Sequence, residues 1–247
     1  MVSSQRPVAL VTGSARRIGA AIARALHAAD YDVVLHQRQC TPELTALAAE
    51  LETRRNGSTL MLAAELADLD AVSRMPERCV ERFGRLDALV NNASSFFATQ
   101  LGSITPTQWD DLFAANARAP LFLAQAAAPL LRKRRGAIVN LLDIHADRPP
   151  TGYSVYAMAK SALETLTASL AIELAPEIRV NGIALGAILW AETEHDDVER
   201  KARILKRTPL GRLGEVDEVA SAVVFLLRDA RYCTGSILRV DGGRSLV

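Results

Sequence analysis

The sequence predicts a single α/β domain with a parallel sheet of about seven strands and helices on both faces. Three observations predict it: a length of 247 residues of which 49% are hydrophobic, apolar segments of strand length that recur along the chain, and helix-like stretches between most of them. Strands that alternate with helices need crossover connections, which produce a parallel sheet covered on both sides. We therefore expect one domain over residues 1–247.

Seven apolar segments of the sequence are the expected strands. Parallel sheets of this kind bind ligands beyond the carboxyl ends of their strands. The alternation lapses over about 187–213, a polar stretch that is either an exposed helical insertion or a flap over a substrate. The segments are residues 8–11, 33–35, 59–62, 88–90, 137–142, 178–183 and 237–240, and the acidic part of the polar stretch holds Glu192, Glu194, His195, Asp196 and Asp197.

Charge and composition favour a small-molecule partner. With 29 Lys and Arg against 28 Asp and Glu, the formal net charge is +1, which offers no broad field for nucleic acid or a membrane surface. No segment reaches the roughly 18 apolar residues of a membrane helix. Cys40, Cys79 and Cys233 are far apart in sequence and form no CxxC pair, so we expect reduced thiols and no metal site. We also expect a cytoplasmic protein.

The first expected strand runs directly into a glycine-containing turn, Thr12 to Gly19 (TGSARRIG), and a helix with apolar Ile22 and Leu26 follows. Glycine lets the backbone approach a pyrophosphate, and the helix N-terminus supplies free N–H donors. A plain tight turn is the alternative. The strand–turn–helix context favours a doubly wound, Rossmann-type nucleotide site whose first residues are Gly13, Arg16, Arg17, Ile18 and Gly19.

The second expected strand ends in His36-Gln37-Arg38, without the Asp or Glu that an NAD site would place there for the ribose hydroxyls. His36 and Arg38, together with Arg16 and Arg17, suit a dianionic 2′-phosphate. Each arginine taken alone is equally well a solvated surface charge. As a cluster they favour NADP(H) as the cofactor.

Tyr156 and Lys160 lie four residues apart, so on a helix the phenol and the ammonium share one face and can act on each other. A tyrosine of pKa about 10 is a poor acid or base at neutral pH. We expect the neighbouring ammonium and the positive nicotinamide of an oxidised cofactor to stabilise tyrosinate and so lower this pKa.

These motifs together resemble the short-chain dehydrogenases/reductases over essentially the whole chain. The resemblance implies that Asn92 and Ala93 line the cofactor, that Lys160 also bonds the nicotinamide ribose, and that Asn116 holds a water in a proton relay. It also assigns Glu65, Leu66 and Gly186 to the cofactor site. The motifs that carry it are Thr12-Gly13 with Gly19, Asn91-Asn92-Ala93, Asn116, Tyr156 with Lys160, Asn181 and Asp241-Gly242-Gly243.

The resemblance further implies a homotetramer built on the helix that carries Tyr156 and the helix before it. On that basis Leu163, Leu166 and Leu170 are expected at an interface rather than in the core.

The chain departs from the family pattern at Asp143, which lies thirteen residues before Tyr156 where most members have a serine. An ionised carboxylate only accepts hydrogen bonds and is a poor partner for a ketone oxygen. Asp143 suits a substrate rich in N–H groups, or a proton supply to a ring nitrogen through Tyr156.

Two further departures, Arg17 in place of a glycine and Ser94-Ser95-Phe96 after Asn-Asn-Ala, resemble together with Asp143 the pteridine reductase branch. This resemblance implies that Arg17 reaches phosphate and pterin, that Ser94 touches cofactor and pterin, and that Phe96 stacks on the pterin ring. Trp190 either closes a wall of the pocket or packs inside the flap.

The sequence therefore predicts an NADPH-dependent pteridine reductase that reduces dihydrobiopterin, dihydromonapterin or possibly dihydrofolate, with Asp143 and Tyr156 as the proton-transfer pair. One alternative is a carbonyl reductase of the same family that acts on a 3-oxoacyl or steroid-like ketone, against which Asp143 argues. A remote alternative is a non-catalytic NADP(H)-sensing module, which would need a damaged catalytic pair, whereas Tyr156 and Lys160 are both present.

Overall fold

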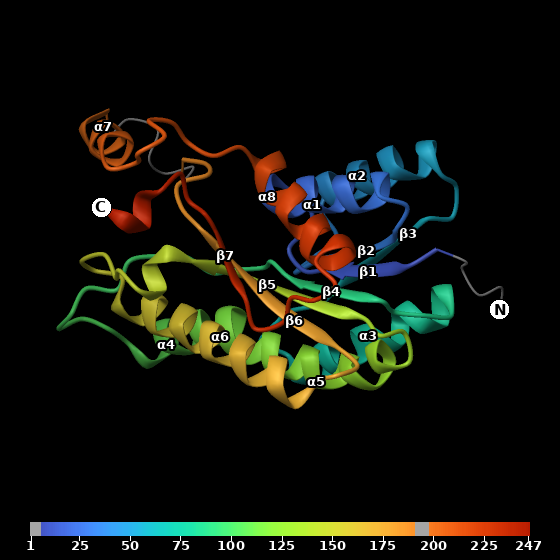
Figure 1. Cartoon of the computed structure of the whole chain (residues 1–247). Helices are drawn as coiled ribbons and strands as arrows, with labels where there is room; N and C mark the ends of the chain where they lie inside the picture. The colour runs from blue at the N-terminus through green and yellow to red at the C-terminus, as the bar shows by residue number, and fades with distance from the viewer. Residues whose placement is uncertain (1–5, 191–197) are drawn as a thin grey trace.

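The computed structural model describes residues 6–190 and 198–247, which form the predicted parallel sheet (Figure 1). Its seven strands lie in the order β3-β2-β1-β4-β5-β6-β7, so the order reverses at β1 and opens a crevice at the carboxyl ends of β1 and β4. The expected Rossmann-type topology is confirmed. The strands are β1 (Val8–Val11), β2 (Asp32–Gln37), β3 (Thr59–Ala63), β4 (Ala88–Asn91), β5 (Ala137–Asp143), β6 (Arg179–Leu185) and β7 (Ile237–Val240).

Helices cover both faces of the sheet, as Figure 1 shows. One layer contains α1 (Arg17–Ala28), α2 (Pro42–Arg54) and α8 (Val216–Val224), and the opposite layer contains α3 (Leu69–Phe83), α5 (Ala119–Arg132) and α6 (Ser154–Glu173). The remaining elements are α4 (Pro106–Phe113), α7 (Val198–Lys206), the π-helical turns η1 (Ala114–Arg118) and η3 (Phe225–Asp229), and the short 3-10 turns η2 (Ile144–Ala146) and η4 (Arg244–Leu246).

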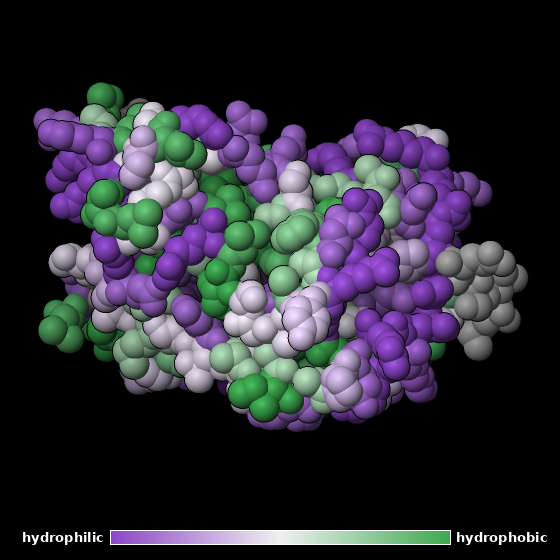
Figure 2. Space-filling view, viewed as in Figure 1, coloured by the Kyte–Doolittle hydropathy of each residue, from purple (hydrophilic) through white to green (hydrophobic). Residues whose placement is uncertain are grey.

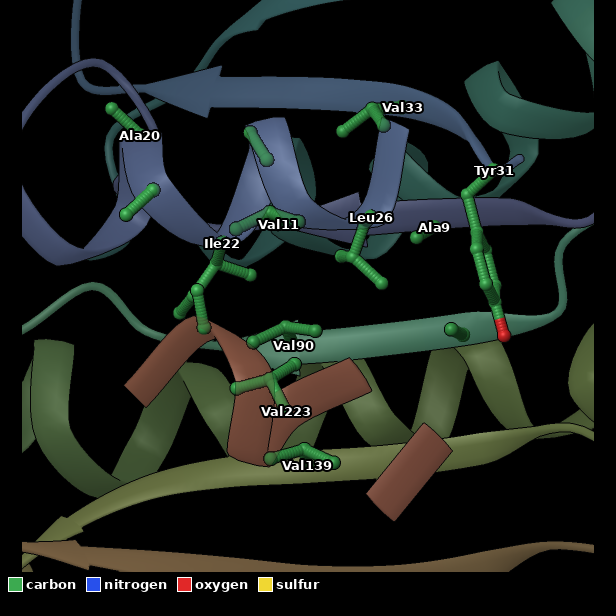
Figure 3. Close-up of a cluster of buried hydrophobic side chains, with 14 of the residues drawn as sticks. Ala9, Val11, Ala20, Ile22, Leu26, Tyr31, Val33, Val90, Val139 and Val223 are labelled. Atoms are coloured by element: carbon green, nitrogen blue, oxygen red, sulfur yellow. The ribbon is translucent and has the colours of Figure 1, made fainter. Parts of the chain in front are cut away.

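The two layers divide the residues of each central strand between them. Ala9 and Val11 of β1 pack with the α1 and α8 layer, whereas Val8 and Leu10 pack with the α3 and α5 layer. Because both faces are buried, the strand must be apolar throughout rather than alternating. Figure 3 shows the first of these clusters, in which Ile22 and Leu26 of α1 lie against the sheet and Val223 of α8.

A buried polar chain connects the sheet to α6. Asn91 donates to the side-chain oxygen of Asn140 at 2.8 Å, Asn140 donates to the Thr167 hydroxyl at 2.9 Å, and Thr167 donates to the Leu163 carbonyl at 2.8 Å. Satisfied buried networks of this kind specify one arrangement, because each unpaired member would cost free energy. The network therefore fixes the helix that carries Tyr156 relative to β4 and β5.

The leucines expected at an interface belong to the core instead. Leu163 is 2% exposed and Leu170 is 7% exposed within the single chain, and Leu166 packs between their two clusters. The expectation failed because the apolar face of α6 is used against β5 and β6 of the same chain.

The polar stretch 187–213 contains α7, and its acidic part, Glu192 to Asp197, lies outside the described residues. In the described part of the chain, no helix has both the length and the apolar character needed to span a bilayer.

Candidate active site

The turn between β1 and α1 is closed so tightly that residue 19 must be glycine. A Cβ on Gly19 would lie 2.1 Å from the Gly13 carbonyl oxygen and 2.7 Å from the Asn92 side-chain nitrogen. Asn92 in turn donates to the backbone oxygens of Thr12 and Gly13, at 2.7 and 3.0 Å. The carboxyl ends of β1 and β4 are therefore joined at a bare backbone cradle at the start of α1, as a bound pyrophosphate requires.

Arg17 adopts the left-handed backbone conformation, with φ +54°, that glycine adopts more readily. A non-glycine residue there costs about 1 kcal/mol, and such residues gather at functional sites. Its guanidinium donates to the carbonyl oxygen of Trp190 at 3.0 Å, so the first residue of α1 reaches across to the segment after β6.

A cavity of about 540 Å³ lies at this edge of the sheet, and the structure gathers there the cofactor residues predicted from the first four strand ends. Those residues are Gly13, Arg16, Arg17, Ile18, Gly19, His36, Arg38, Glu65, Leu66, Asn92, Ala93 and Ser94. Four further residues line this cavity and were not predicted from the sequence: Gln37, Ala64, Ser95 and Ala115. The first three are adjacent in sequence to predicted residues, whereas Ala115 of η1 belongs to no motif.

His36 borders this cavity without the role expected of it. Its ring is buried, Nε2 lies 3.0 Å from the Ala64 carbonyl oxygen, and Nδ1 accepts from the Gly13 backbone N–H at 3.4 Å. Burial lowers the pKa of His36, outweighing the opposing effect of the Ala64 carbonyl. His36 therefore lines the predicted cofactor cavity as a neutral connection between β1, β2 and β3, and the positive charge for a phosphate is left to the arginines.

Positive charge at the mouth of the cavity comes from Arg16, Arg17 and Arg38. Arg38 pairs with Glu65 at 2.9 Å, but both side chains are exposed, at 68% and 46%. Exposed pairs contribute little free energy, so a phosphate can compete with Glu65 for this guanidinium.

A second cavity, of about 790 Å³, meets the first at Arg17, Ile18 and Ser94. It brings together the predicted substrate residues Phe96, Asp143, Tyr156 and Trp190, along with Gly186. Lys160 and Asn116 stand behind the cavity walls, buried at 3% and 0% exposure.

Tyr156 and Asp143 form the centre of this second cavity. The phenolic hydroxyl donates to Asp143 Oδ2 at 2.8 Å, and the backbone N–H of His145 donates to Asp143 Oδ1 at 2.9 Å. Burial alone would raise the pKa of Asp143, but hydrogen bonds and charge from His145, helped by Tyr156, hold it below its usual value. Asp143 is therefore a carboxylate that accepts on both oxygens.

The same arrangement affects the acidity of Tyr156. Burial, the charge of Asp143 and the hydrogen bond to it raise the pKa of Tyr156 well above 10, and the Ser94 hydroxyl opposes this only in part. Without a bound cofactor the phenol therefore keeps its proton, and the expected effect of an oxidised nicotinamide on this pKa stays a prediction.

Lys160 lies behind the pair with its charge poorly solvated. Its Nζ donates to the Leu141 carbonyl at 2.9 Å and lies 5.8 Å from the centroid of the Tyr156 ring. Burial lowers the pKa of Lys160 to about 8, although the charge of Asp143 acts in the opposite direction.

Ser94 and Phe96 complete the junction of the two cavities. Ser94 donates to Asn116 Oδ1 at 2.7 Å, while Asn116 donates to the carbonyls of Ser95 and Leu112, both at 2.9 Å. Phe96 stacks on Tyr153 with ring centroids 4.8 Å apart and meets Tyr156 edge-on at the same separation. Phe96 is thus packed against both tyrosines, yet its side chain stays 44% exposed and lines the cavity.

Several residues of this cavity were missed by the sequence analysis. Tyr153 precedes Tyr156 by three residues and so could have been found from helical spacing. His145 holds Asp143 from two residues away, with Nδ1 3.0 Å from Oδ1. No sequence motif marks the three other arginines that line the cavity, which are Arg203, Arg207 and Arg244.

The glycine cradle and the basic groups fit a nicotinamide dinucleotide, because a side chain at Gly19 would fill the space that the cradle leaves and the donors are those that phosphates accept. Fold and site together define a nicotinamide-dependent oxidoreductase. Comparison with known proteins supports this: the family model described as enoyl-(acyl carrier protein) reductase matches residues 13–245.

The chain is 37% identical to "Pteridine reductase 1" of Leishmania tarentolae over 99% of its own length and 98% of the relative. It is 35% identical to a 3-oxoacyl-(acyl carrier protein) reductase of Staphylococcus aureus, strain Mu50, over 95% and 96% of the two chains. It is 34% identical to a putative ketoacyl reductase of granaticin polyketide synthase from Streptomyces violaceoruber, over 98% of each. The chain belongs to the short-chain dehydrogenase/reductase family, whose members use NAD(P)H as cofactor.

Turnover should decline as the pH rises through about 8, because Lys160 is charged below its pKa and neutral above it. Loss of the ammonium leaves Asp143, and any negative charge that develops on Tyr156, without a cation behind them. Rates of cofactor oxidation between pH 6 and pH 10 measure this. Lys160→Arg keeps its charge over that range, so its profile, scaled to its own maximum, should stay flat; a decline of the same shape in both proteins would contradict a role for the Lys160 charge.

Proposed function

We propose that this enzyme is an NADPH-dependent pteridine reductase that reduces a dihydropterin to the tetrahydropterin. The observation that carries the proposal is the 2.8 Å hydrogen bond from Tyr156 to the Asp143 carboxylate. A reduced nicotinamide, when bound, supplies a hydride to the carbon of a C=N bond. The protein then has to deliver a proton to the adjacent nitrogen.

Tyr156 and Asp143 suit that delivery better than they suit a ketone. The phenol is the single proton donor of the pair, since the carboxylate accepts on both of its oxygens. In reducing a ketone, two donors on the carbonyl oxygen stabilise its developing negative charge, and a carboxylate there repels it. A ring nitrogen is more basic and is flanked by N–H groups that Asp143 can accept from.

The shape of the cavity also supports a flat heterocycle. Phe96, with Tyr153 stacked behind it, offers one aromatic face beside Tyr156. Aromatic rings pack well on such a face at separations of a few ångströms. Ser94, at the junction of the two cavities, is placed to contact cofactor and substrate together.

The second candidate is a carbonyl reductase acting on a 3-oxoacyl or similar ketone. The similarity to 3-oxoacyl and ketoacyl reductases favours it, as do the apolar residues Ile188 and Leu189 in the wall of the cavity. The two candidates use the same cofactor and the same tyrosine, so they differ only in what residue 143 must do.

Asp143→Ser is therefore the decisive substitution. We expect it to lower kcat on a dihydropterin by about 100-fold, the scale of a lost proton-transfer group, and to raise activity on a 3-oxoacyl thioester because serine can donate to the ketone. NADPH oxidation with dihydrobiopterin, dihydromonapterin, dihydrofolate and a 3-oxoacyl thioester measures both effects. Tyr156→Phe is the matched control and should abolish both activities while NADPH still binds. A wild-type enzyme that turns over the thioester and none of the pterins would overturn the proposal.

We propose NADPH rather than NADH on the basis of Arg16, Arg17 and Arg38 at the mouth of the first cavity, where β2 ends without a carboxylate. The expected preference in kcat/KM is at least about tenfold, the worth of one charged hydrogen bond. Arg38→Gln should reduce it by weakening NADPH alone, because NADH has no 2′-phosphate. Equal kcat/KM for the two cofactors in the wild type would refute the assignment.

We further propose a cytoplasmic homotetramer in which residues 187–213 act as a substrate flap. With the leucines of α6 in the core, the apolar residues left for an interface are Leu121 on α5 and Met158 and Ile172 on α6, at 40%, 49% and 79% exposure. Light scattering on the full chain should give four times the chain mass of 26.7 kDa, and Ile172→Glu should reduce it. A monomer mass in the wild type at micromolar concentration would contradict the tetramer.

A further inference from the structure

The second cavity is lined by more positively charged side chains than the proposed reduction of a pterin uses. Four arginines line it, Arg17, Arg203, Arg207 and Arg244, whereas Asp143 is the one acidic side chain among the described residues that do so. Asp143 is already engaged with Tyr156 and His145. The proton transfer and the aromatic plate described above make no use of Arg203, Arg207 or Arg244.

These arginines come from three separate parts of the chain. Arg203 lies in α7, Arg207 follows one turn later just past its end, and the two flank Ile204 on the cavity wall. Arg244 begins η4 near the C-terminus, and Arg17 begins α1. Figure 1 shows α7 and the C-terminal turn at the same end of the molecule, where Figure 2 shows hydrophilic residues mixed with hydrophobic ones.

The helix α7 and the residues after it contact other parts of the chain on both sides of Arg203 and Arg207. Lys201 Nζ lies 5.5 Å from the centroid of the Trp190 ring, and Trp190 is itself bonded through its carbonyl to Arg17. Beyond α7, Thr208 is buried and the Leu210 N–H donates to the Gly242 carbonyl at 3.1 Å. These contacts hold Arg203 and Arg207 against the cavity.

Arg203 and Arg207 differ in their position from the arginines on the rest of the surface. Neither forms an ion pair with any residue in the described ranges 6–190 and 198–247, although both are exposed. Many other exposed arginines face carboxylates, as in the pairs Arg24–Glu50, Arg78–Glu81 and Arg212–Glu218, whereas some, such as Arg118 and Arg134, form no ion pair within the described ranges. Arg203 and Arg207 are distinguished by their position, because they line one cavity together with Arg17 and Arg244. A cavity wall that gathers like charges is disfavoured until an anion enters it.

We propose that this wall is a subsite for an anionic substituent on the substrate, a carboxylate or a phosphate. The inference rests on the proposed function, because the substituent would be carried by the pterin ring that we propose to bind on Phe96 beside Tyr156. Guanidinium groups match both anions with paired N–H donors. The enzyme then prefers a dihydropterin with an acidic side chain over one with a neutral side chain.

The test compares kcat/KM for substrates that share the dihydropterin ring: dihydrobiopterin with a neutral side chain, dihydrofolate with two carboxylates, and dihydroneopterin phosphate. The variant is Arg203→Gln/Arg207→Gln. The control is Lys206→Gln, which removes one positive charge from α7 at a position that does not line the cavity, whereas the double variant removes two charges that do. We expect the double variant to lose about tenfold in kcat/KM on one or both anionic substrates, through KM, and less than twofold on dihydrobiopterin. Raising the salt concentration should reduce the wild-type preference.

The three substrates separate the possible results. Loss on dihydrofolate alone assigns the subsite to carboxylates, and loss on the phosphate alone assigns it to phosphates. Equal loss on all three, or the same loss in Lys206→Gln, would overturn the subsite, as would no loss at all.

Failure of the proposed function is recognised separately, because the wild type would then reduce no dihydropterin. In that case binding of p-aminobenzoylglutamate and of inorganic pyrophosphate to the NADPH-bound enzyme, measured by calorimetry, decides the subsite without turnover. Weaker binding of either probe by the double variant than by Lys206→Gln supports it, and equal binding by both variants refutes it.

Discussion

A proton held between the phenol of Tyr156 and the carboxylate of Asp143 is the interaction on which the chemistry of this site depends. The carboxylate and burial raise the pKa of Tyr156, so the phenol stays protonated, and a nearby cation is needed before it can give that proton up. We propose Lys160 as that cation, since its Nζ lies 5.8 Å from the centroid of the Tyr156 ring, but burial lowers its own pKa to about 8. The three groups therefore form one coupled unit, and the charge on one sets the proton affinity of the next.

This coupling favours reduction over oxidation. Oxidation of an alcohol requires a base, and a tyrosinate beside an ionised Asp143 would place two negative charges within hydrogen-bond distance. Reduction starts from the state that the structure stabilises, a protonated phenol with its hydrogen already directed to an acceptor. The bond to Asp143 must be exchanged for a bond to the substrate, which is easiest when the substrate nitrogen is a good acceptor and its neighbouring N–H groups bond Asp143 in return.

The fold was predictable because strands that are buried on both faces consist mainly of apolar residues, and such segments can be recognised in the sequence. Both faces of β1 and β5 are covered, which favours apolar residues on both, and in β5 the buried Asn140 is hydrogen-bonded. The expected segments agree with the observed strands to within a few residues. The turn at Gly13 and Gly19 was predictable from its position between a strand and a helix, although part of the crowding that requires glycine there comes from the distant Asn92 and Ala93. The spacing of Tyr156 and Lys160 puts them on one helix face, and the family motifs elsewhere in the chain single this pair out as a catalytic candidate.

What could not be predicted depends on contacts between distant segments. His36 is neutral because Ala64 of the β3 end and Gly13 of the β1 end close around it, and neither partner marks the histidine in sequence. Leu163 and Leu170 are apolar in either role, and only the position of α6 on the sheet makes them core. The pKa of Tyr156 in the absence of cofactor could not be foreseen either, because the sequence shows which charges are near without showing that the Asp143 carboxylate is the one hydrogen-bonded to the phenol.

Relatives of both kinds, pteridine reductase and 3-oxoacyl reductase, are similar to this chain over nearly their whole length, so the shared backbone cannot distinguish their substrates. The difference must lie in the few side chains that meet the reacting atoms. Residue 143 lies at the end of β5, in register with Leu185 of β6, a position set by the sheet whatever its side chain. A serine there would add a second donor beside Tyr156, whereas Asp143 adds an acceptor. Exchanging donor for acceptor at one fixed point changes the preferred partner from an oxygen that gains negative charge to a ring edge that carries both N–H groups and a basic nitrogen.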